Sequence, residues 1–503
     1  MTTVVAHGVD IVDSLSLLSL KVAPNVFDLS SGMHHVSIRD QIVRARLVIR
    51  DLKKADITLQ SILIVGCGVA GLAAAIAAQE AKISEILVVD SAEEPLSLFK
   101  GVTERYVGPY MYEWPSQFFG NQSFPSHSRT PWIHSPGSPL SWTLKEPCNA
   151  SYFSRLFLSS IKASLSASGA PKILLGVSRQ AVRGFVKDFA RNEGKAGLAR
   201  IEGRLRPSLL KLQLEGMPYP SKEVSSVRIH PQYVFLAGGM GNESTKLVQR
   251  DRFQPSYSGV NFWGKKFWEN DQLRSQMMVD RHVYIFGGGD GAIQDALRTL
   301  TGMKHPLEML KHLNQDIRVK NAIDRAAPIL LSMDRQGRQQ TAWTHGPVAN
   351  ETLDDLCRKL AVELSQRTEM CTRVANAIRP GRGQVFMFVK EGYIAKAYLL
   401  NRFLIHLIAE CSNAAPRLFL RKIKFAIFWQ HQAWQYSQKN GQHHVEIRDH
   451  ASSSVRIHMP DEIVVRYGIE AGSVPGAQMI HLSPKRSRQR TTLARVELPF
   501  APN

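Results

Sequence analysis

The sequence predicts an α/β fold in which two units are built on parallel strands. A short apolar strand pattern at Ser61–Val65 runs straight into a glycine turn and an apolar helix, and the same order recurs from His282–Phe286. A third observation, the mostly helical pattern of residues 303–425, adds a largely helical region to these two units.

Length and composition are those of an ordinary globular protein. The 503 residues suffice for two or three domains, and 44% of them are hydrophobic and 21% charged. The chain has no uninterrupted apolar run of about 18 residues, the length that a membrane span requires. The first residues show neither the basic segment nor the cleavage pattern of a signal peptide. We therefore expect a cytoplasmic protein that does not insert into membranes.

The five cysteines are too far apart to form a familiar site. They are odd in number and include no C-x-x-C pair, which argues against a disulfide framework, a zinc ribbon and a redox site of neighbouring thiols. His127 and His134 have no other ligand at metal-ligand spacing, and the adjacent His443 and His444 would point to opposite faces of a strand. The sequence therefore predicts no metal site.

A net charge of +20 is the unusual bulk property. Excess cations favour polyanionic partners, such as phosphorylated cofactors, acidic substrates, nucleic acid or an anionic membrane face. Part of the charge is local, at Arg417–Lys424 and Lys485–Arg490. A solvated surface with a mobile basic tail also explains the charge, and it is the interpretation that we favour. Beyond it, the charge predicts at most weak contact with nucleic acid or another polyanion. The sequence does not predict an oligomeric state.

The first unit has the order of a β-turn-helix-β motif. A helix pattern at Val36–Lys54 precedes the buried strand Ser61–Val65, the helix Ala70–Ala81 and the strand Glu85–Asp90. A helix over Asn149–Ala167 follows. The later strands of this unit are predicted at Lys172–Val177, around Leu209–Leu214, and at Tyr233–Ala237.

The second unit begins at His282–Phe286 and is less regular. Pro328–Met333 is its next buried-strand candidate, and the apolar stretch Tyr393–Ala409 belongs to the helical region. Residues 444–468 alternate in the manner of two or three strands. These patterns predict an N-terminal extension at 1–60, a first dinucleotide-binding domain at 61–250 and a second unit at 275–345. A helical cap or substrate region follows at 346–440, and C-terminal strands with a basic tail at 441–503.

The first glycine turn has the spacing of a dinucleotide-binding site. Gly66 allows a tight turn, Gly68 lets the backbone approach a diphosphate, and Gly71 lets the helix pack closely on the strand. The helix start at Val69 and Ala70 offers free N–H groups to the phosphates. The pattern has every part of the motif in the expected order: strand, turn, helix, second strand and terminal acid. The combination is therefore far more specific than the glycines alone.

The acid is Asp90, at the end of the second strand, where a carboxylate accepts hydrogen bonds from a ribose hydroxyl. We also expect the neighbouring Ser91 to contact the cofactor. In the loop that follows, Arg105 is a candidate to neutralise the diphosphate, and Tyr106, Tyr110 or Trp114 to stack on a ring. A packed aromatic loop with an exposed arginine explains the same residues.

At this point the sequence resembles the flavoproteins with two dinucleotide-binding domains, which include pyridine-nucleotide oxidoreductases and flavin monooxygenases. Gly66–Ala75 is similar to their FAD turn, G-x-G-x-x-G-L followed by an alanine-rich helix. Val234–Gly239 resembles the strand ending in Ala-Thr-Gly where their chain returns to the FAD domain. The resemblance implies that FAD lies over the first turn, with Gly238 and Gly239 beside it.

The second glycine turn is similar to the G-G-G-D-S-A nicotinamide turn of the same family, with Gly287, Gly289 and Gly291 as the candidate contacts for NADP or NAD. No strand ending in an acid or an arginine follows about 20 positions on, where the adenosine ribose is normally bound. The family's closing strand, which ends in Gly-Asp beside the flavin, is also missing, and Glu462–Gly468 is the candidate for its place. The second turn therefore binds a nicotinamide cofactor, or it binds none. In the second case it is a structural turn, or it contacts part of FAD or a substrate.

Three functions follow. The first is an FAD-dependent oxidoreductase that passes hydride from NAD(P)H to flavin and then to a small-molecule substrate or oxygen. The second is an FAD-dependent oxidase of an amine or amino acid, with an architectural second turn. The third is a regulatory protein in which a bound dinucleotide controls contacts of the basic surface. No catalytic residue is predicted, because the flavin itself carries the redox chemistry.

Overall fold

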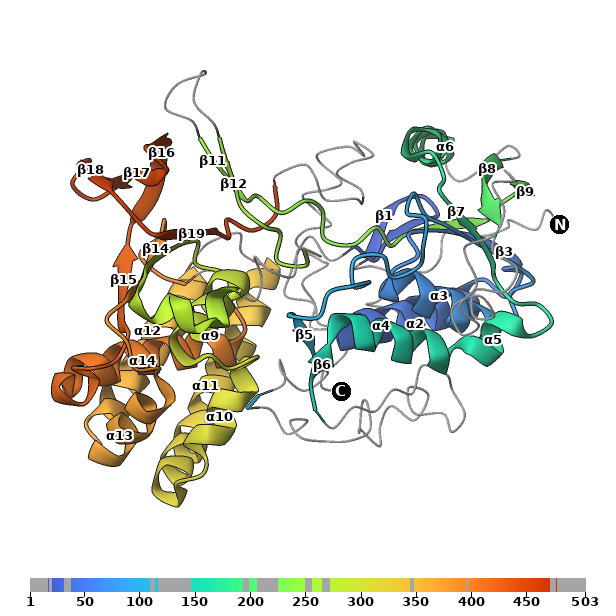
Figure 1. The fold of residues 1–503 in the computed structure, drawn as a ribbon. Helices are drawn as coiled ribbons and strands as arrows, with labels where there is room; N and C mark the ends of the chain where they lie inside the picture. Colours follow the sequence, from blue (N-terminus) through green and yellow to red (C-terminus); the bar gives the residue numbers. More distant parts are fainter. Residues whose placement is uncertain are drawn as a thin grey trace.

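The computed structural model describes residues 17, 20–30, 38–108, 114–115, 146–192, 199–205, 225–248, 256–264, 272–343, 348–394, 397–470 and 476. Two α/β bodies lie side by side, and each is built around its own sheet (Figure 1). This arrangement confirms the predicted fold class. Within the described residues, no helix is long and apolar enough to cross a membrane.

The first sheet has eight strands in the order β1-β2-β10-β3-β4-β7-β8-β9. Five neighbouring strands are parallel, and β1, β8 and β9 extend the sheet in antiparallel pairs. The strands are β1 Lys21–Ala23, β2 Val26–Asp28, β3 Ser61–Val65, β4 Glu85–Val89, β7 Lys172–Leu175, β8 Ala199–Leu205, β9 Ser225–Ile229 and β10 Tyr233–Leu236.

Helices cover both faces of this sheet because its strand residues alternate between two apolar cores. Ile62 and Ile64 belong to the core under α2 (Ile38–Ala55), α3 (Val69–Glu80) and α4 (Ala150–Ser160). Leu63 belongs to the opposite core, under α6 (Arg179–Arg191). The short helix α5 (Lys162–Ser166) follows α4. All residues of α3 from Val69 to Ala78 are buried, which explains its alanine-rich, apolar composition.

The second sheet has four parallel strands in the order β15-β14-β13-β19. They are β13 His282–Phe286, β14 Gln384–Val389, β15 Lys424–Trp429 and β19 Glu462–Val465. The helices of this body are α9 Asp290–Thr301, α10 Pro306–Leu313, α11 Ile317–Trp343, α12 Val348–Ser365, α13 Thr368–Ala377 and α14 Leu399–Ala414. They gather against one face of the sheet, with Val283 and Ile285 in the shared core.

A small antiparallel sheet covers the other face. Its strands are β16 His431–Lys439, β17 Gln442–Asp449 and β18 Val455–His458. Tyr436 and Val445 from this sheet pack on Phe286 and Phe388. Short elements complete the described fold: β5 Tyr106–Val107, β6 Cys148–Asn149, β11 Lys246–Leu247, β12 Tyr257–Ser258, and the 3-10 helices η3 Gln272–Arg274, η4 Gln276–Asp280 and η5 Pro416–Phe419.

Two expectations about the second body are wrong. Pro328–Met333 lies inside α11, not in a strand, because the buried residues Val319, Ile323 and Leu330 continue a helical stripe through it. The true neighbour of β13 is β14, a strand of six residues within a region that we expected to be helical. Its short apolar run is not distinguished from a buried helix by periodicity.

The closing strand is also placed differently from the expectation. Glu462–Gly468 contains β19, which pairs with β13 in the second sheet and does not join the first. The position beside β10 in the first sheet belongs to β2. The predicted domain limits remain a prediction. Each sheet includes strands from more than one predicted domain. In the first sheet, β2 comes from the predicted N-terminal extension, and in the second, β14, β15 and β19 come from the predicted cap and C-terminal region. The strand expected around Leu209–Leu214 lies outside the described residues.

Candidate cofactor site

The first turn joins β3 to α3 and is closed by two glycines at positions where a side chain would collide with the backbone. Gly66 has a φ of +117°, and a Cβ there would lie 2.2 Å from the carbonyl oxygen of Ala237. A Cβ on Gly71 would lie 1.8 Å from the carbonyl oxygen of Gly66. These two positions therefore hold strand, turn and helix together.

Gly68 has a different environment. It is the N-cap of α3 with ordinary backbone angles, and a Cβ on it would meet nothing within 4 Å. No side chain caps the helix, and its first turn carries no acid. The N–H groups at Val69 and Ala70 thus begin a helix whose positive end faces open space. This is the cradle that a diphosphate group requires.

Asp90 stands beside this turn. Its carboxylate accepts hydrogen bonds from the N–H groups of Cys67 at 2.6 Å and Ala92 at 2.8 Å. The next residue, Ser91, accepts a hydrogen bond from Arg179 Nε at 2.8 Å. The predicted acid is therefore fixed at the carboxyl end of β4, next to the glycines. Burial, followed by the charge of Asp90, raises the pKa of the Cys67 thiol, so this cysteine is a packed neutral residue.

The return strand β10 brings Gly238 and Gly239 to the same edge. The N–H of Ala237 donates to Val65 O at 2.7 Å, which seats the end of β10 against the first turn. Gly239 has a φ of +89° and open space at its Cβ position. The carboxyl ends of β3, β4 and β10 therefore meet at one edge, where parallel α/β sheets bind ligands.

The same edge carries an acid that the sequence pattern did not reveal. β2 runs parallel to β10 and ends at Asp28, which is buried. Its carboxylate accepts hydrogen bonds from the N–H of Ser30 at 2.8 Å and from the Ser30 hydroxyl. Gly476 lies directly against it, because a Cβ there would be 2.6 Å from Asp28 Oδ2. A three-residue strand near the start of the chain has no periodicity by which to find it.

Arg105 has a different role from the expected diphosphate contact. Its guanidinium is buried and bonds to Asp295 of α9 through both terminal nitrogens, and its Nε donates to Phe262 O at 2.8 Å. Arg466 Nε donates to the same carboxylate at 2.8 Å. Burial alone would raise the pKa of Asp295, but the charges of Arg105 and Arg466 outweigh it and lower this pKa to about 2. The cluster is an ionic link between the two bodies.

The aromatic candidates of the same loop also face the second body. Tyr106 lies against His305, with ring centres 5.3 Å apart, and Trp114 stacks on Phe403 at 5.4 Å. Tyr110 lies outside the described residues. The sequence could not separate these contacts from flavin stacking, because both require an aromatic loop.

The second turn repeats the backbone of the first. Gly287 has a φ of +136°, with Arg466 O only 2.0 Å from its Cβ position, and Gly289 is the N-cap of α9. The N–H of Gly287 donates to Phe388 O of β14. Gly291 instead makes room for packing, since its Cβ position lies 3.3 Å from both Arg466 Cδ and Phe262 Cδ2.

The equivalence of the two turns identifies the residue in the place of Asp90. Gly66 donates to Val89 O and Gly287 to Phe388 O, so Val389 corresponds to Asp90. The Val389 side chain packs over Gly288, where a Cβ would lie 2.8 Å from Val389 Cγ1. The exposed Lys390 follows. The strand missing from the sequence pattern therefore exists, but the helices α9 to α13 separate it from its turn.

The second turn also carries an acid at its helix start. Asp290 accepts hydrogen bonds from the N–H of Tyr398 at 2.7 Å and from Asn401 Nδ2 at 2.9 Å. Burial raises the pKa of Asp290 to about 7, although these hydrogen bonds and the charge of Arg402 oppose the shift. Burial at this position therefore favours the neutral form of Asp290.

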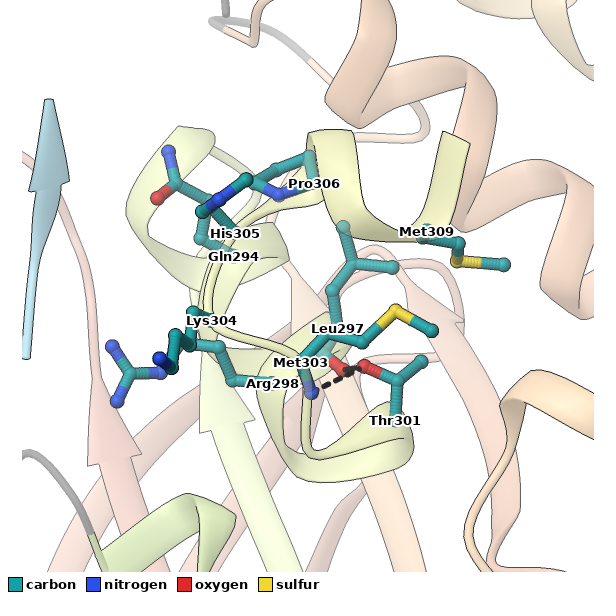
Figure 2. Close-up of a pocket in the computed structure, with 9 residues that line it drawn as sticks. All are labelled: Gln294, Leu297, Arg298, Thr301, Met303, Lys304, His305, Pro306 and Met309. Atoms are coloured by element: carbon teal, nitrogen blue, oxygen red, sulfur yellow. Dashed lines mark hydrogen bonds between the residues drawn. The ribbon is translucent and has the colours of Figure 1, made fainter. Parts of the chain in front are cut away.

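A small pocket lies at the other end of α9, away from the turn. It is formed by Gln294, Leu297, Arg298, Thr301, Met303, Lys304, His305, Pro306 and Met309, with the N–H of Met303 donating to Thr301 Oγ1 (Figure 2). Because the lining comes from α9 and the start of α10, the pocket is a feature of helix packing separate from both glycine turns. Among the described residues, no three histidine, cysteine or acidic side chains are grouped as metal ligands.

No protein-family model matches the chain, and no curated protein matches its sequence. Solved structures of distantly similar shape include an FAD-bound cadaverine monooxygenase of Erwinia amylovora, at 8% identity and a TM-score of 0.37, covering 82% of this chain and 79% of that one. The reduced ornithine hydroxylase of Pseudomonas aeruginosa matches at 12% identity and a TM-score of 0.35, covering 82% of each chain. The thioredoxin reductase of Lactococcus lactis matches at 10% identity and a TM-score of 0.32, covering 81% of this chain and 77% of that one.

Proposed function

We propose that the protein is an FAD-dependent oxidoreductase that holds its flavin cofactor at the first glycine turn. The single observation that carries the proposal is the uncapped start of α3 behind Gly68, which is open to a diphosphate and flanked by the fixed carboxylate of Asp90. Packing alone does not explain why open space at Gly68 occurs together with an acid at the end of the next strand.

In this proposal each residue at the edge has a binding task. The N–H groups that follow Gly68 receive the diphosphate, and Asp90 keeps lone pairs for the ribose hydroxyls besides its two backbone contacts. Gly239 lets the return strand approach the cofactor without a side chain between them. The bound flavin supplies the redox chemistry, and this chain supplies orientation and electrostatics.

For the second turn we propose a nicotinamide cofactor, with NADPH preferred to NADH. Support comes from Val389 and Lys390: the position that would carry an acid for an unmodified ribose carries valine, and an exposed cation follows. A ribose 2′-phosphate gains from that cation and meets no carboxylate. The substrate that the reduced flavin would act on, and a cytoplasmic location, remain predictions from the sequence.

An architectural second turn is favoured by one observation, the packing of Phe262 and Arg466 against Gly291. In that case the protein is an oxidase whose α9 serves only to join the two bodies. The Asp295 cluster is compatible with either function, because it lies on the buried side of α9.

Purified protein tests the proposal directly. We expect a flavin absorption spectrum after incubation with FAD and desalting, and anaerobic bleaching by NADPH faster than by NADH. Bleaching by an amine or amino acid alone would select the oxidase. A protein that takes up no flavin would exclude both and leave the regulatory function.

A further inference from the structure

The basic stretch Arg417–Lys424 forms a surface on which two leucines face solvent. Leu418 is 40% exposed and Leu420 76% exposed, on either side of Phe419, which is buried as the anchor of η5. A single exposed leucine is ordinary, but two in one turn, held outward by a buried aromatic residue, form a local apolar projection.

Exposed cations surround this projection. Arg417, Arg421 and Lys424 come from the same stretch, and Arg382 lies next to them. Hydrogen bonds bring the two segments together, from Gly381 N–H to Arg421 O at 3.1 Å and from Lys424 N–H to Gly383 O at 3.0 Å. We call Arg382, Arg417, Leu418, Leu420, Arg421 and Lys424 the η5 surface.

The carboxylate of Asp280 borders the η5 surface but leaves it basic. Asp280 accepts a hydrogen bond from the N–H of Arg382 at 2.9 Å. The four cations of the η5 surface outnumber this acid, and the whole chain carries a charge of +20.

The η5 surface lies at the opposite edge of the second sheet from the glycine turn. Lys424 begins β15 and pairs with Gln384, which begins β14, so this is the amino edge of the parallel strands. The turn at Gly287 follows their carboxyl ends. A large partner on the η5 surface therefore leaves the cofactor edge uncovered.

We propose that the η5 surface docks on an anionic lipid surface. The cations are attracted to the negative headgroups, and Leu418 and Leu420 enter the boundary between headgroups and acyl chains. Nucleic acid would satisfy the cations but would offer no apolar layer to the leucines. The contact is peripheral, and it requires no membrane-spanning helix.

Vesicle sedimentation of the full-length protein tests the proposal, with phosphatidylcholine vesicles and vesicles containing phosphatidylserine. We expect binding only to the anionic vesicles. Leu420→Asp removes the apolar contact and adds repulsion, and we expect it to weaken binding more than tenfold. Arg421→Glu should weaken binding by roughly 25-fold, since each cation near such a surface contributes about a fivefold factor and the reversal removes one attraction and adds a repulsion of similar size.

Ile57→Asp is the matched control, because Ile57 is 79% exposed but lies in the first body, in the loop after α2. It should bind like the wild type. Far-ultraviolet circular dichroism confirms that each variant is folded. Absence of wild-type binding, equal binding by Leu420→Asp, or equal loss in Ile57→Asp would each overturn the proposal. Binding to single-stranded RNA that Leu420→Asp leaves unchanged, with no binding to vesicles, would assign the surface to nucleic acid instead.

Discussion

The two glycine turns share a backbone and differ in what surrounds it. In both, a glycine with positive φ lies against a carbonyl oxygen of a neighbouring strand segment, and a second glycine caps the helix. The first turn has Asp90 alongside and no acid at its helix start. The second has Val389 alongside and Asp290 at its helix start.

This difference indicates unequal affinity for phosphate groups. Helix starts attract anions, and a negative charge in the first turn of the helix weakens that attraction. Of the two helices that follow the glycine turns, α9 has such an acid and α3 does not. We therefore expect the first turn to retain its cofactor through purification and the second to bind and release its ligand.

The largest effect should come from the shared part of the two turns. Gly66→Ala and Gly287→Ala each place a Cβ within 2.2 Å of a carbonyl oxygen, at 2.2 Å and 2.0 Å respectively. We expect each to lower the free energy of unfolding by about 3 kcal/mol or more, measured by urea denaturation.

Gly169→Ala is the control for these variants. Gly169 has a φ of +74° with open space at its Cβ position, so alanine meets backbone strain without a clash. A loss of about 1 kcal/mol is expected there. If all three substitutions cost the same, the close approach would not be what fixes the turns.

Asp90→Asn sharpens the comparison at the residue that differs. Loss of the charge should weaken FAD binding by about 10- to 100-fold, the range for a hydrogen bond to a charged group, measured by quenching of flavin fluorescence. Asp449 also accepts a hydrogen bond from the N–H two positions on, that of Ala451, at 2.8 Å. Asp449→Asn is therefore the matched control, because Asp449 has no proposed cofactor role. Equal FAD affinity in both variants would contradict the assignment of Asp90.

Lys390→Glu tests the second turn in the same way. The reversal should raise KM for NADPH by roughly tenfold through loss of an exposed charge contact, while KM for NADH changes little. Lys439→Glu, at an exposed lysine on β16, should leave both constants unchanged. A parallel change for the two nicotinamides would show that Lys390 does not contact a 2′-phosphate.

A further difference between the two turns is a pH dependence of stability from Asp290. Its pKa in the folded protein, about 7, lies above the value of 3.8 for an unperturbed aspartate, so folding favours the neutral form. The stability that this group contributes is fully present below about pH 4 and is lost as pH rises through about 7. Asp290→Asn keeps an oxygen acceptor for Tyr398 and should flatten that fall in thermal unfolding between pH 4 and 8. An unchanged slope would contradict the raised pKa.

The parts that sequence analysis predicted are local. Ser61–Val65, the turn at Gly66 and the acid at Asp90 lie within one β-turn-helix-β unit, so pattern and spacing suffice to find them. The second strand and turn at His282–Phe286 and Gly287 were predicted for the same reason.

The parts that it missed depend on contacts between distant segments. β2 is recognised as a strand only by its pairing with β10, and through that pairing Asp28 reaches the edge of the sheet that carries the first glycine turn. Arg105 finds its partner Asp295 in the other body. β14 lies beside β13 only after several helices have intervened, and its apolar run alone does not specify a strand.

FAD affinity of Gly68→Leu tests the central claim most directly. Gly68 has ordinary backbone angles and open space at its Cβ position, so leucine should leave the fold intact and occupy the volume assigned to the diphosphate. Gly184→Leu, in an equally open position on α6, is the control. We expect Gly184→Leu to bind FAD like the wild type and folded Gly68→Leu to lose flavin absorbance. Full retention of FAD by Gly68→Leu would contradict the account.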